Sequence, residues 1–294
     1  TFKQTATHDI MEKDNQLWVA TDGGGINIIS LDDFSFTNIQ QKQDDVHSFP
    51  ANTIYRLYLD SANNMWAGSI RRGLIGIRNV FACSYQNVPF GNLYGLSNQT
   101  INSFFQDSDG MVWVGTDGGG INRFDPLTGT FKHYPSTMHE KVVSIVEYTP
   151  DELLFSSFNE GLFIFHKQTG RVRPFVLVDK ETNGRECIDG FSVNIRRVTP
   201  DKILFSGQHI FIYDTTRRKF EIVATMGREY ERNSPLIIAT VGTKTYLTDL
   251  KNICEYDSSE GIFRTIYQGK YIINDASRDQ DGVFWLASTE GLVR

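Results

Sequence analysis

Short runs of apolar and β-prone residues alternate with turns rich in Gly, Asp and Pro along the whole chain. Residues 100–134 show the pattern best, and there it predicts four successive strands at 100–106, 111–116, 121–124 and 130–134. The turns between them carry residues that favour reversal of the chain, at 107–110, 117–120 and 125–129. No 3.6-residue apolar period is sustained over a helix length, so almost no helix is expected.

This four-strand unit recurs along the chain. Residues 17–27 (LWVATDGGGIN) and 112–122 (VWVGTDGGGIN) are nearly identical, and weaker copies follow the same order. The second strand of each copy carries an aromatic anchor, and the anchors are 39 to 50 residues apart: Trp18, Trp66, Trp113, Phe155, Phe205, Tyr246 and Trp285. This spacing is typical of propeller blades. The sequence therefore predicts an all-β fold, a single seven-bladed β-propeller of four-stranded antiparallel blades over residues 1–294.

The two ends of the chain suggest how the ring closes. The last copy supplies strands at 271–277 and 283–288 and begins a third at 292–294. Residues 1–4 (TFKQ) resemble the outer strand at 130–133 (TFKH). We therefore expect the N-terminal strand to complete the last blade, which would protect exposed strand edges. Both ends resemble cuts through a repeat, so a fragment of a longer multidomain protein is expected.

Composition narrows the function classes. The chain is 40% hydrophobic and 13% aromatic, which is enough to bury a large core, and its net charge is −6. An acidic balance without a long basic run disfavours nucleic-acid binding. The three cysteines, Cys83, Cys187 and Cys254, are far apart, so neither a disulfide framework nor a zinc site is expected. No stretch of 18 apolar residues is present, and no signal peptide is visible.

The repeat resembles a known family. The motif Asp-x-x-Gly-x-x-Trp-x-Gly-Thr, then Gly-Gly-Gly-Ile-Asn, then Phe-Asp-Pro-x-Thr-Gly-x-Phe-x-x-Tyr stands in full from Asp107 to Tyr134. It is similar to the two-component regulator propeller repeat. The copies anchored on Trp18, Trp113 and Trp285 match well and that on Trp66 fairly, whereas the three copies between Trp113 and Trp285 are degenerate. The resemblance spans the whole chain.

The resemblance implies a function for the parent protein. Such propellers form the periplasmic sensor region of hybrid two-component systems in Bacteroides-type bacteria, inner-membrane proteins that carry a second propeller, a β-sandwich, a transmembrane helix and a histidine kinase. They detect oligosaccharides from dietary or host glycans and control transcription of utilisation genes. The implied partners are an oligosaccharide, the other domains of the same chain and a second copy in a homodimer. None of the later modules is visible in these residues.

Several motifs have both a functional and a structural interpretation. The Asp-Gly-Gly-Gly segments at 22–25 and 117–120 lack the Lys-Ser/Thr and the helix of a phosphate loop, so structural turns are the better interpretation. The Asp-x-Asp-Gly segments at 107–110 and 279–282 lack the later ligands of a calcium loop and read as hairpin turns. Their Asp109-to-Trp113 spacing of four also differs from the five-residue spacing of a sialidase Asp-box.

The scattered histidines and carboxylates show no metal-ligand spacing, and no Gly-x-Ser-x-Gly nucleophile motif occurs. No cofactor, metal or catalytic residue is therefore predicted.

Ligand binding is expected in the loops, which a rigid scaffold holds in place. Two sets of loops should share one rim: the turns between the second and third strands of each blade, and the connections between blades, of which 40–52, 89–99 and 179–191 are long. The Arg71-Arg72 pair replaces glycines of the repeat and offers bidentate bonds to a sugar carboxylate or sulfate, unless it is a solvated turn. The candidate ligand-binding residues are Arg71, Arg72, Tyr94, Arg185, His209 and Lys251.

Three hypotheses remain open at this point. The first is a binding module that senses a glycan and performs no chemistry. The second is a scaffold or dimerisation propeller, with recognition elsewhere in the parent protein. The third is a propeller polysaccharide lyase or hydrolase, which would require a compact His, Tyr, Arg and carboxylate cluster at the channel mouth.

Overall fold

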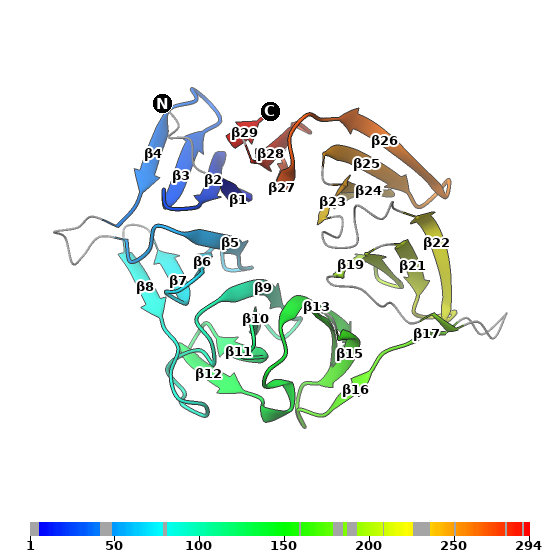
Figure 1. Cartoon of the computed structure of the whole chain (residues 1–294), viewed down its shortest axis with the longest axis horizontal. Helices are drawn as coiled ribbons and strands as arrows, with labels where there is room; N and C mark the ends of the chain where they lie inside the picture. Colours follow the sequence, from blue (N-terminus) through cyan, green and yellow to red (C-terminus); the bar gives the residue numbers. More distant parts are fainter. Residues whose placement is uncertain are drawn as a thin grey trace.

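The computed structural model shows a closed ring of small antiparallel sheets around a central axis (Figure 1). It describes residues 6–41, 49–78, 81–158, 160–178, 185–186, 193–207, 209–225, 236–249, 251–279, 281–289 and 291–294. Within these ranges the only helical element is one short 3-10 turn, η1 (Pro135–Thr137). The predicted seven-bladed β-propeller is confirmed.

Each blade is a simple up-and-down meander, with its first strand nearest the axis and its last strand outermost (Figure 1). Blade one consists of β1 (Thr7–Lys13), β2 (Gln16–Thr21), β3 (Ile26–Ser30) and β4 (Phe36–Ile39). Blade two consists of β5 (Ile54–Leu59), β6 (Met65–Ser69), β7 (Leu74–Arg78) and β8 (Phe81–Tyr85). Blade three consists of β9 (Ile101–Gln106), β10 (Val112–Thr116), β11 (Ile121–Asp125) and β12 (Thr130–His133), close to the predicted bounds.

The degenerate copies form blades of the same design. Blade four contains β13 (Val142–Thr149), β14 (Glu152–Ser157), β15 (Gly161–His166) and β16 (Val172–Pro174). A small hairpin of β17 (Leu177–Val178) and β18 (Arg185–Glu186) precedes blade five, which contains β19 (Asn194–Thr199), β20 (Lys202–Ser206), β21 (His209–Asp214) and β22 (Lys219–Thr225). Blade six contains β23 (Leu236–Val241), β24 (Lys244–Asp249), β25 (Asn252–Asp257) and β26 (Ile262–Gln268).

Blade seven contains three described strands, β27 (Ile273–Arg278), β28 (Phe284–Ser288) and β29 (Gly291–Val293). The segment predicted to complete it, residues 1–4, lies outside the described residues. Ring closure is visible without it, because the inner strands β1 and β27 lie side by side (Figure 1). Thr7 Oγ1 donates a hydrogen bond to Ser288 O, and Asn274 Nδ2 donates one to Thr7 O.

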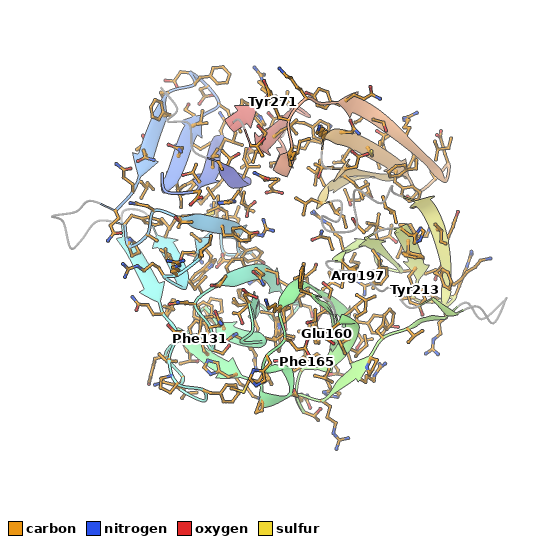
Figure 2. All side chains as sticks on the ribbon, in the orientation of Figure 1. Phe131, Glu160, Phe165, Arg197, Tyr213 and Tyr271 are labelled. Atoms are coloured by element: carbon orange, nitrogen blue, oxygen red, sulfur yellow. The ribbon has the colours of Figure 1, made fainter. Side chains whose placement is uncertain are left out.

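The core consists of the interfaces between blades. Among the described residues, seven separate hydrophobic clusters occur, one at each boundary between neighbouring blades. Phe131 belongs to the boundary of blades two and three, Phe165 to that of blades three and four, and Tyr213 to that of blades four and five (Figure 2). The seventh cluster joins Ile10 and Leu17 to Trp285 across the closure. A single blade has no core of its own, so its stability depends on both neighbours.

All seven predicted anchors are buried on the second strands of their blades, but two of them face the other way. Strand pairing places Leu154 and Leu204, not Phe155 and Phe205, in register with the tryptophans. Trp113 packs toward the following blade, whereas Phe155 packs back toward blade three and Phe205 back toward blade four. Adjacent residues of a strand face opposite sides of the sheet, so a one-residue difference reverses the direction of an anchor.

Three tryptophans are also fixed by a buried carboxylate six residues earlier. Trp66 Nε1 donates to Asp60 Oδ2 at 2.8 Å, Trp113 Nε1 to Asp107 Oδ2 at 2.7 Å, and Trp285 Nε1 to Asp279 Oδ2 at 2.8 Å. The other oxygen of each carboxylate accepts backbone N–H groups of the hairpin turn. The Asp of the Asp-x-x-Gly motif therefore ties the turn to the anchor.

Asp60 shows how these hydrogen bonds change the pKa of the buried carboxyl group. Burial alone raises the pKa of Asp60, but the hydrogen bonds from Trp66, Asn64 and Ala62 outweigh burial, and the pKa lies below its ordinary value. The ionised form is thus favoured in the folded protein.

The inner strands are linked around the axis by side-chain bonds to the next blade's backbone. Among the described residues, such links occur at six of the seven boundaries, and one from each boundary is Asp9 Oδ2 with Leu57 N, Arg56 Nε with Asn102 O, Ser103 Oγ with Val142 O, Ser144 Oγ with Ile195 O, Arg196 Nη1 with Ile237 O, and Asn274 Nδ2 with Thr7 O. Each link satisfies a backbone group that the blade's own ladder leaves unpaired at its inner edge. Polar bonds near the axis thus supplement the apolar contacts between sheets.

Two carboxyl groups meet where the ring closes. Ile10 N donates to Asp9 Oδ1 at 2.8 Å and to Asp275 Oδ2 at 3.2 Å, while Asp9 Oδ2 accepts from Leu57 N at 2.6 Å. Burial and the adjacent Asp9 carboxylate raise the pKa of Asp275 well above its ordinary value. The pair thus connects blades seven, one and two, and is most stable when it holds a proton.

We expect Trp66→Phe to cost more stability than Trp18→Phe. Both rings are buried, but Trp18 Nε1 has no hydrogen-bond partner among the described residues, whereas Trp66 Nε1 has Asp60. The difference in the free energy of unfolding should be about 1.5–3 kcal/mol, the contribution of a hydrogen bond to a charged group. Urea unfolding of the two variants measures it, and equal losses would show that the Asp–Trp bond adds nothing.

We expect Asp275→Asn to reduce the pH dependence of stability. The folded pKa of Asp275 lies above its ordinary value of 3.8, so its stabilisation is complete below 3.8 and is lost as the pH rises through the folded pKa. The asparagine stays neutral, so the decline should become shallower. Urea unfolding across a pH series tests this, with Asp151→Asn in an exposed turn as control. An unchanged slope in Asp275→Asn would contradict the prediction.

Candidate functional site

One rim of the ring brings together the two predicted sets of loops. The turn after the second strand of a blade contacts the connection that leads to the next blade: Gly25 N donates to Asn52 O, Gly73 N to Gln99 O and Gly120 N to Glu140 O. These three glycines have positive φ, and a Cβ on any of them would lie 2.1 Å from a carbonyl oxygen. The glycine that ends each turn is therefore required by close packing of the rim.

A cavity of about 340 Å³ opens on this rim between blades one and two. It is within the usual size range of small-molecule sites. Its walls come from the β2–β3 turn, the connection between the two blades and the β6–β7 turn. The lining residues are Asp22, Gln41, Ala51, Asn52, Thr53, Ile70, Arg71 and Arg72.

Comparison with the next blade boundary explains why the cavity exists. There, Asn98 Nδ2 donates to Asp117 O at 2.8 Å and Ser97 Oγ donates to Gly119 O at 2.7 Å, so the connection closes over the turn. At the first boundary Ala51 stands in the position of Asn98, since Thr53 and Thr100 both immediately precede the next inner strand. The methyl group of Ala51 can make no such bond, and the space remains open.

The turn on the other side of the cavity also departs from the repeat. Arg71 and Arg72 stand where blade three has Gly118 and Gly119, and neither arginine has a positive φ, whereas Gly118 does. Arg72 N donates to Ser69 Oγ at 2.7 Å, which fixes the turn in its own way. Both arginines are exposed, and neither guanidinium forms an ion pair with any described residue.

An acidic residue faces the arginines across the cavity. Asp22 is held by its backbone N–H, which donates to Ala6 O, and by Thr53 Oγ1, which donates to Asp22 Oδ1 at 3.1 Å. His8 lies within electrostatic range of Asp22, and its ring is tilted against that of Tyr55, with 5.0 Å between the ring centroids. Burial lowers the pKa of His8 despite the attraction of Asp22, so the imidazole is neutral at pH 7. Positive charge at the cavity therefore comes from the arginines.

The other predicted ligand residues do not reach this cavity. Tyr94 is 73% exposed in the connection before blade three, which is attached to that blade because Gly91 N donates to His133 Nδ1 and His133 Nε2 donates to Gly95 O. Arg185 lies on β18, in the hairpin beside the outer strand β22 (Figure 1).

The last two candidates belong to blades five and six. His209 is half-buried in β21, where its ring lies edge-on to Phe211 at 5.7 Å. Lys251 is exposed in the β24–β25 turn beside a space of only about 10 Å³. Thus the structure brings together only Arg71 and Arg72 of the six predicted residues, and it adds Asp22, Gln41 and Thr53. Other members of the predicted loop sets, Asn159, Gln208 and Glu290, lie outside the described residues.

The Asp-x-Asp-Gly turns have a structural role here. Both carboxylate oxygens of Asp107 accept hydrogen bonds, from Met111 N and from Trp113 Nε1, and Lys167 Nζ lies 3.1 Å from Oδ2. Oxygens engaged by donors and an ammonium group are poorly placed to bind a cation. Among the described residues, no group of three or more His, Cys, Asp and Glu side chains is arranged to hold a metal ion.

The repeat is similar to one that is known from other proteins. The family model described as two component regulator propeller matches residues 48–71 and 95–118. No curated protein is a significant match to the chain. The first matched segment contains five of the cavity residues: Ala51, Asn52, Thr53, Ile70 and Arg71.

Solved structures show the same fold at low sequence identity. The extracellular domain of a hybrid two component system from B. thetaiotaomicron is 19% identical with a TM-score of 0.79; the match covers 99% of this chain and 40% of that chain. A virginiamycin B lyase from Staphylococcus aureus is 15% identical with a TM-score of 0.71, covering 99% and 94% of the two chains. A streptogramin B lyase is 13% identical with a TM-score of 0.72, covering 99% and 93%.

In the part of the chain that the structure describes, no helix has the length and apolar character needed to cross a membrane. The family model and the recurring Asp, Trp and Gly contacts agree on the nature of the repeat. The chain is therefore a seven-bladed propeller, two segments of which match the two component regulator propeller model, in agreement with the resemblance in its sequence.

Proposed function

We propose that this propeller is a sensor module of a hybrid two-component system, located in the periplasm of a bacterium. It binds an oligosaccharide derived from a glycan at the rim cavity between blades one and two. Binding shifts an equilibrium of the parent protein, which a cytoplasmic histidine kinase converts into a transcriptional response. Other domains of the same chain and a second copy of the parent protein are the proposed partners.

The observation that carries the proposal is the cavity itself. It arises from departures of the repeat at both of its walls, Ala51 in place of an asparagine and Arg71-Arg72 in place of two glycines. With an asparagine at position 51 the rim would be more closed, and with glycines at positions 71 and 72 it would be less charged. Sugars are recognised by polar side chains that present several donors and acceptors around a rigid pocket, which is what Asp22, Asn52 and the arginines provide.

The similarity to the hybrid two component extracellular domain supports the sensor reading, and the chain spans only 40% of that domain. The similarity to the two lyases concerns the fold, and folds host many functions. A lyase or hydrolase would need an acid, a base and charge stabilisation converging on one cavity. At the rim cavity, the Nε2 atom of His8 is buried and is not presented to a ligand, which leaves Asp22 as the carboxylate that lines the cavity.

We expect Ala51→Asn to abolish ligand binding and, because Ala51 is buried in the apolar cluster between blades one and two, also to lower stability. The asparagine copies Asn98, whose side chain spans from the connection to the neighbouring turn in the next blade. The test is a thermal-shift and calorimetric screen of oligosaccharides released from dietary and host glycans. A saturating ligand at 100 times its Kd adds about 2.7 kcal/mol to the free energy of unfolding of the unsubstituted protein.

The matched control is Ala62→Asn, at an exposed turn on the opposite rim. Binding that persists in Ala51→Asn would place the ligand elsewhere on the propeller. If no oligosaccharide shifts the stability of the unsubstituted protein, whereas a longer ectodomain does respond, the scaffold hypothesis replaces the sensor one.

We further expect that an oligosaccharide bound by the propeller is recovered intact. Prolonged incubation followed by mass spectrometry of the sugar checks this. Cleavage that a substitution at Asp22 removes would instead establish the enzyme hypothesis.

A further inference from the structure

We propose that the rim cavity selects sugars that carry an oxyanion group, a uronate carboxylate or a sulfate ester, over neutral sugars. This inference rests on the proposed function and names the ligand class of the same cavity. The group would lie against Arg71 and Arg72, with the sugar ring toward Ala51 and Ile70 and the hydroxyl groups toward Asp22 and Asn52.

The charge balance of the lining supports this class. The described residues that line the cavity include two guanidinium groups and one carboxylate, so these side chains together carry a positive charge in a protein of net charge −6. In blade three, Asp117 stands at the position of Asp22. Its negative charge is balanced by Lys141, with which it forms an ion pair at 3.4 Å. Arg71 and Arg72 have no acidic partner among the described residues. Both guanidinium groups are exposed, so a ligand in the cavity can reach them.

The identity of the side chains adds geometry to the charge. A guanidinium group presents a planar set of donors that matches a carboxylate or a sulfate, which a lysine ammonium cannot reproduce. Two adjacent arginines on one turn provide two such groups. Asp22, Gln41 and Asn52 provide acceptors and donors of the kind that sugar hydroxyls require, and Asp22 would repel an oxyanion placed on its own side. The ligand orientation is thus set by the opposite charges of the two walls.

The apolar part of the wall fits a sugar face. Ala51 and Ile70 contribute carbon atoms to the lining between the charged turns. Pyranose rings present patches of C–H groups that pack on such surfaces, while a free inorganic anion would gain nothing there. The cavity therefore favours an acidic sugar over inorganic sulfate or phosphate.

Calorimetry with four matched sugars tests the inference: D-galacturonate against D-galactose, and glucose 6-sulfate against glucose. We expect both anionic sugars to bind more tightly than their neutral partners, with an affinity that falls as salt rises. Whichever of the two anions binds more tightly identifies the oxyanion. Equal affinity of the neutral and anionic partners would overturn the inference.

The variant R71Q/R72Q should lose affinity for the anionic sugars by at least about tenfold, the effect of losing one charge-assisted hydrogen bond or more. R71K/R72K keeps the charge but not the planar donors and should recover only part of the loss. The matched control is R217Q/R218Q, which removes the same charge from an exposed turn on the opposite rim. If this control weakens binding as much as R71Q/R72Q does, the effect is one of overall charge and the inference fails.

The inference and the proposed function fail in different ways. A neutral oligosaccharide that binds with an affinity unaffected by R71Q/R72Q, but sensitive to Ala51→Asn, would retain the sensor cavity and overturn its anionic selectivity. Absence of binding by every sugar, acidic or neutral, would overturn both. Inorganic sulfate that binds as tightly as glucose 6-sulfate would show that the arginines hold only an adventitious ion.

Discussion

A blade of this propeller has two apolar faces and no interior, and every other feature of the structure follows from that constraint. Each face must be covered by a neighbour, so the blades can be stable only in a closed ring in which every boundary is packed. The seven clusters of buried residues meet this requirement, including the one between Trp285 and Ile10 at the closure. The four tryptophans face in one direction around the ring, and the smaller Val19 and Val114 face in the other.

The same constraint explains the polar bonds that accompany the apolar boundaries. Sheets that only touch face to face can slide, whereas a side chain bonded to a neighbour's backbone fixes one sheet relative to the next. The links near the axis and the Asp–Trp pairs at the hairpin turns act at opposite ends of a blade. At the closure, the shared Ile10 N–H brings Asp9 and Asp275 together and couples this boundary to protonation. Such fixed boundaries allow a cavity between two blades to keep its shape.

The sequence predicts the ring better than it predicts the site, for a physical reason. Strand, turn and anchor depend on local patterns that recur, so even the degenerate copies could be assigned to blades. Where the tryptophan is absent, the pattern no longer shows which face a residue occupies. The aromatic pattern therefore predicts Phe155 and Phe205 as anchors, whereas Leu154 and Leu204 occupy the position of the tryptophans.

The site depends instead on which loops meet, and that is a property of the closed ring. Tyr94 and Arg185 stand in long connections as expected. Arg185 lies between blades four and five, far along the ring from Arg71, and the segment of Tyr94 is attached to blade three through His133. Thr53 carried no signal in the sequence, because its contact with Asp22 joins different blades. A signal was present at position 51, where alignment of the connections shows alanine opposite Asn98.

A repeat protein acquires a binding site at the positions where one copy differs from the others without disturbing their shared contacts. Gly73 keeps its positive φ and its bond to Gln99 O, and Thr53 keeps the position just before the inner strand. These retained contacts hold the rim in the form that the other blades require. Arg71 and Arg72 are exposed and vary beside these contacts without removing them. Because such residues can change while the shared contacts stay, one scaffold can bind different ligands.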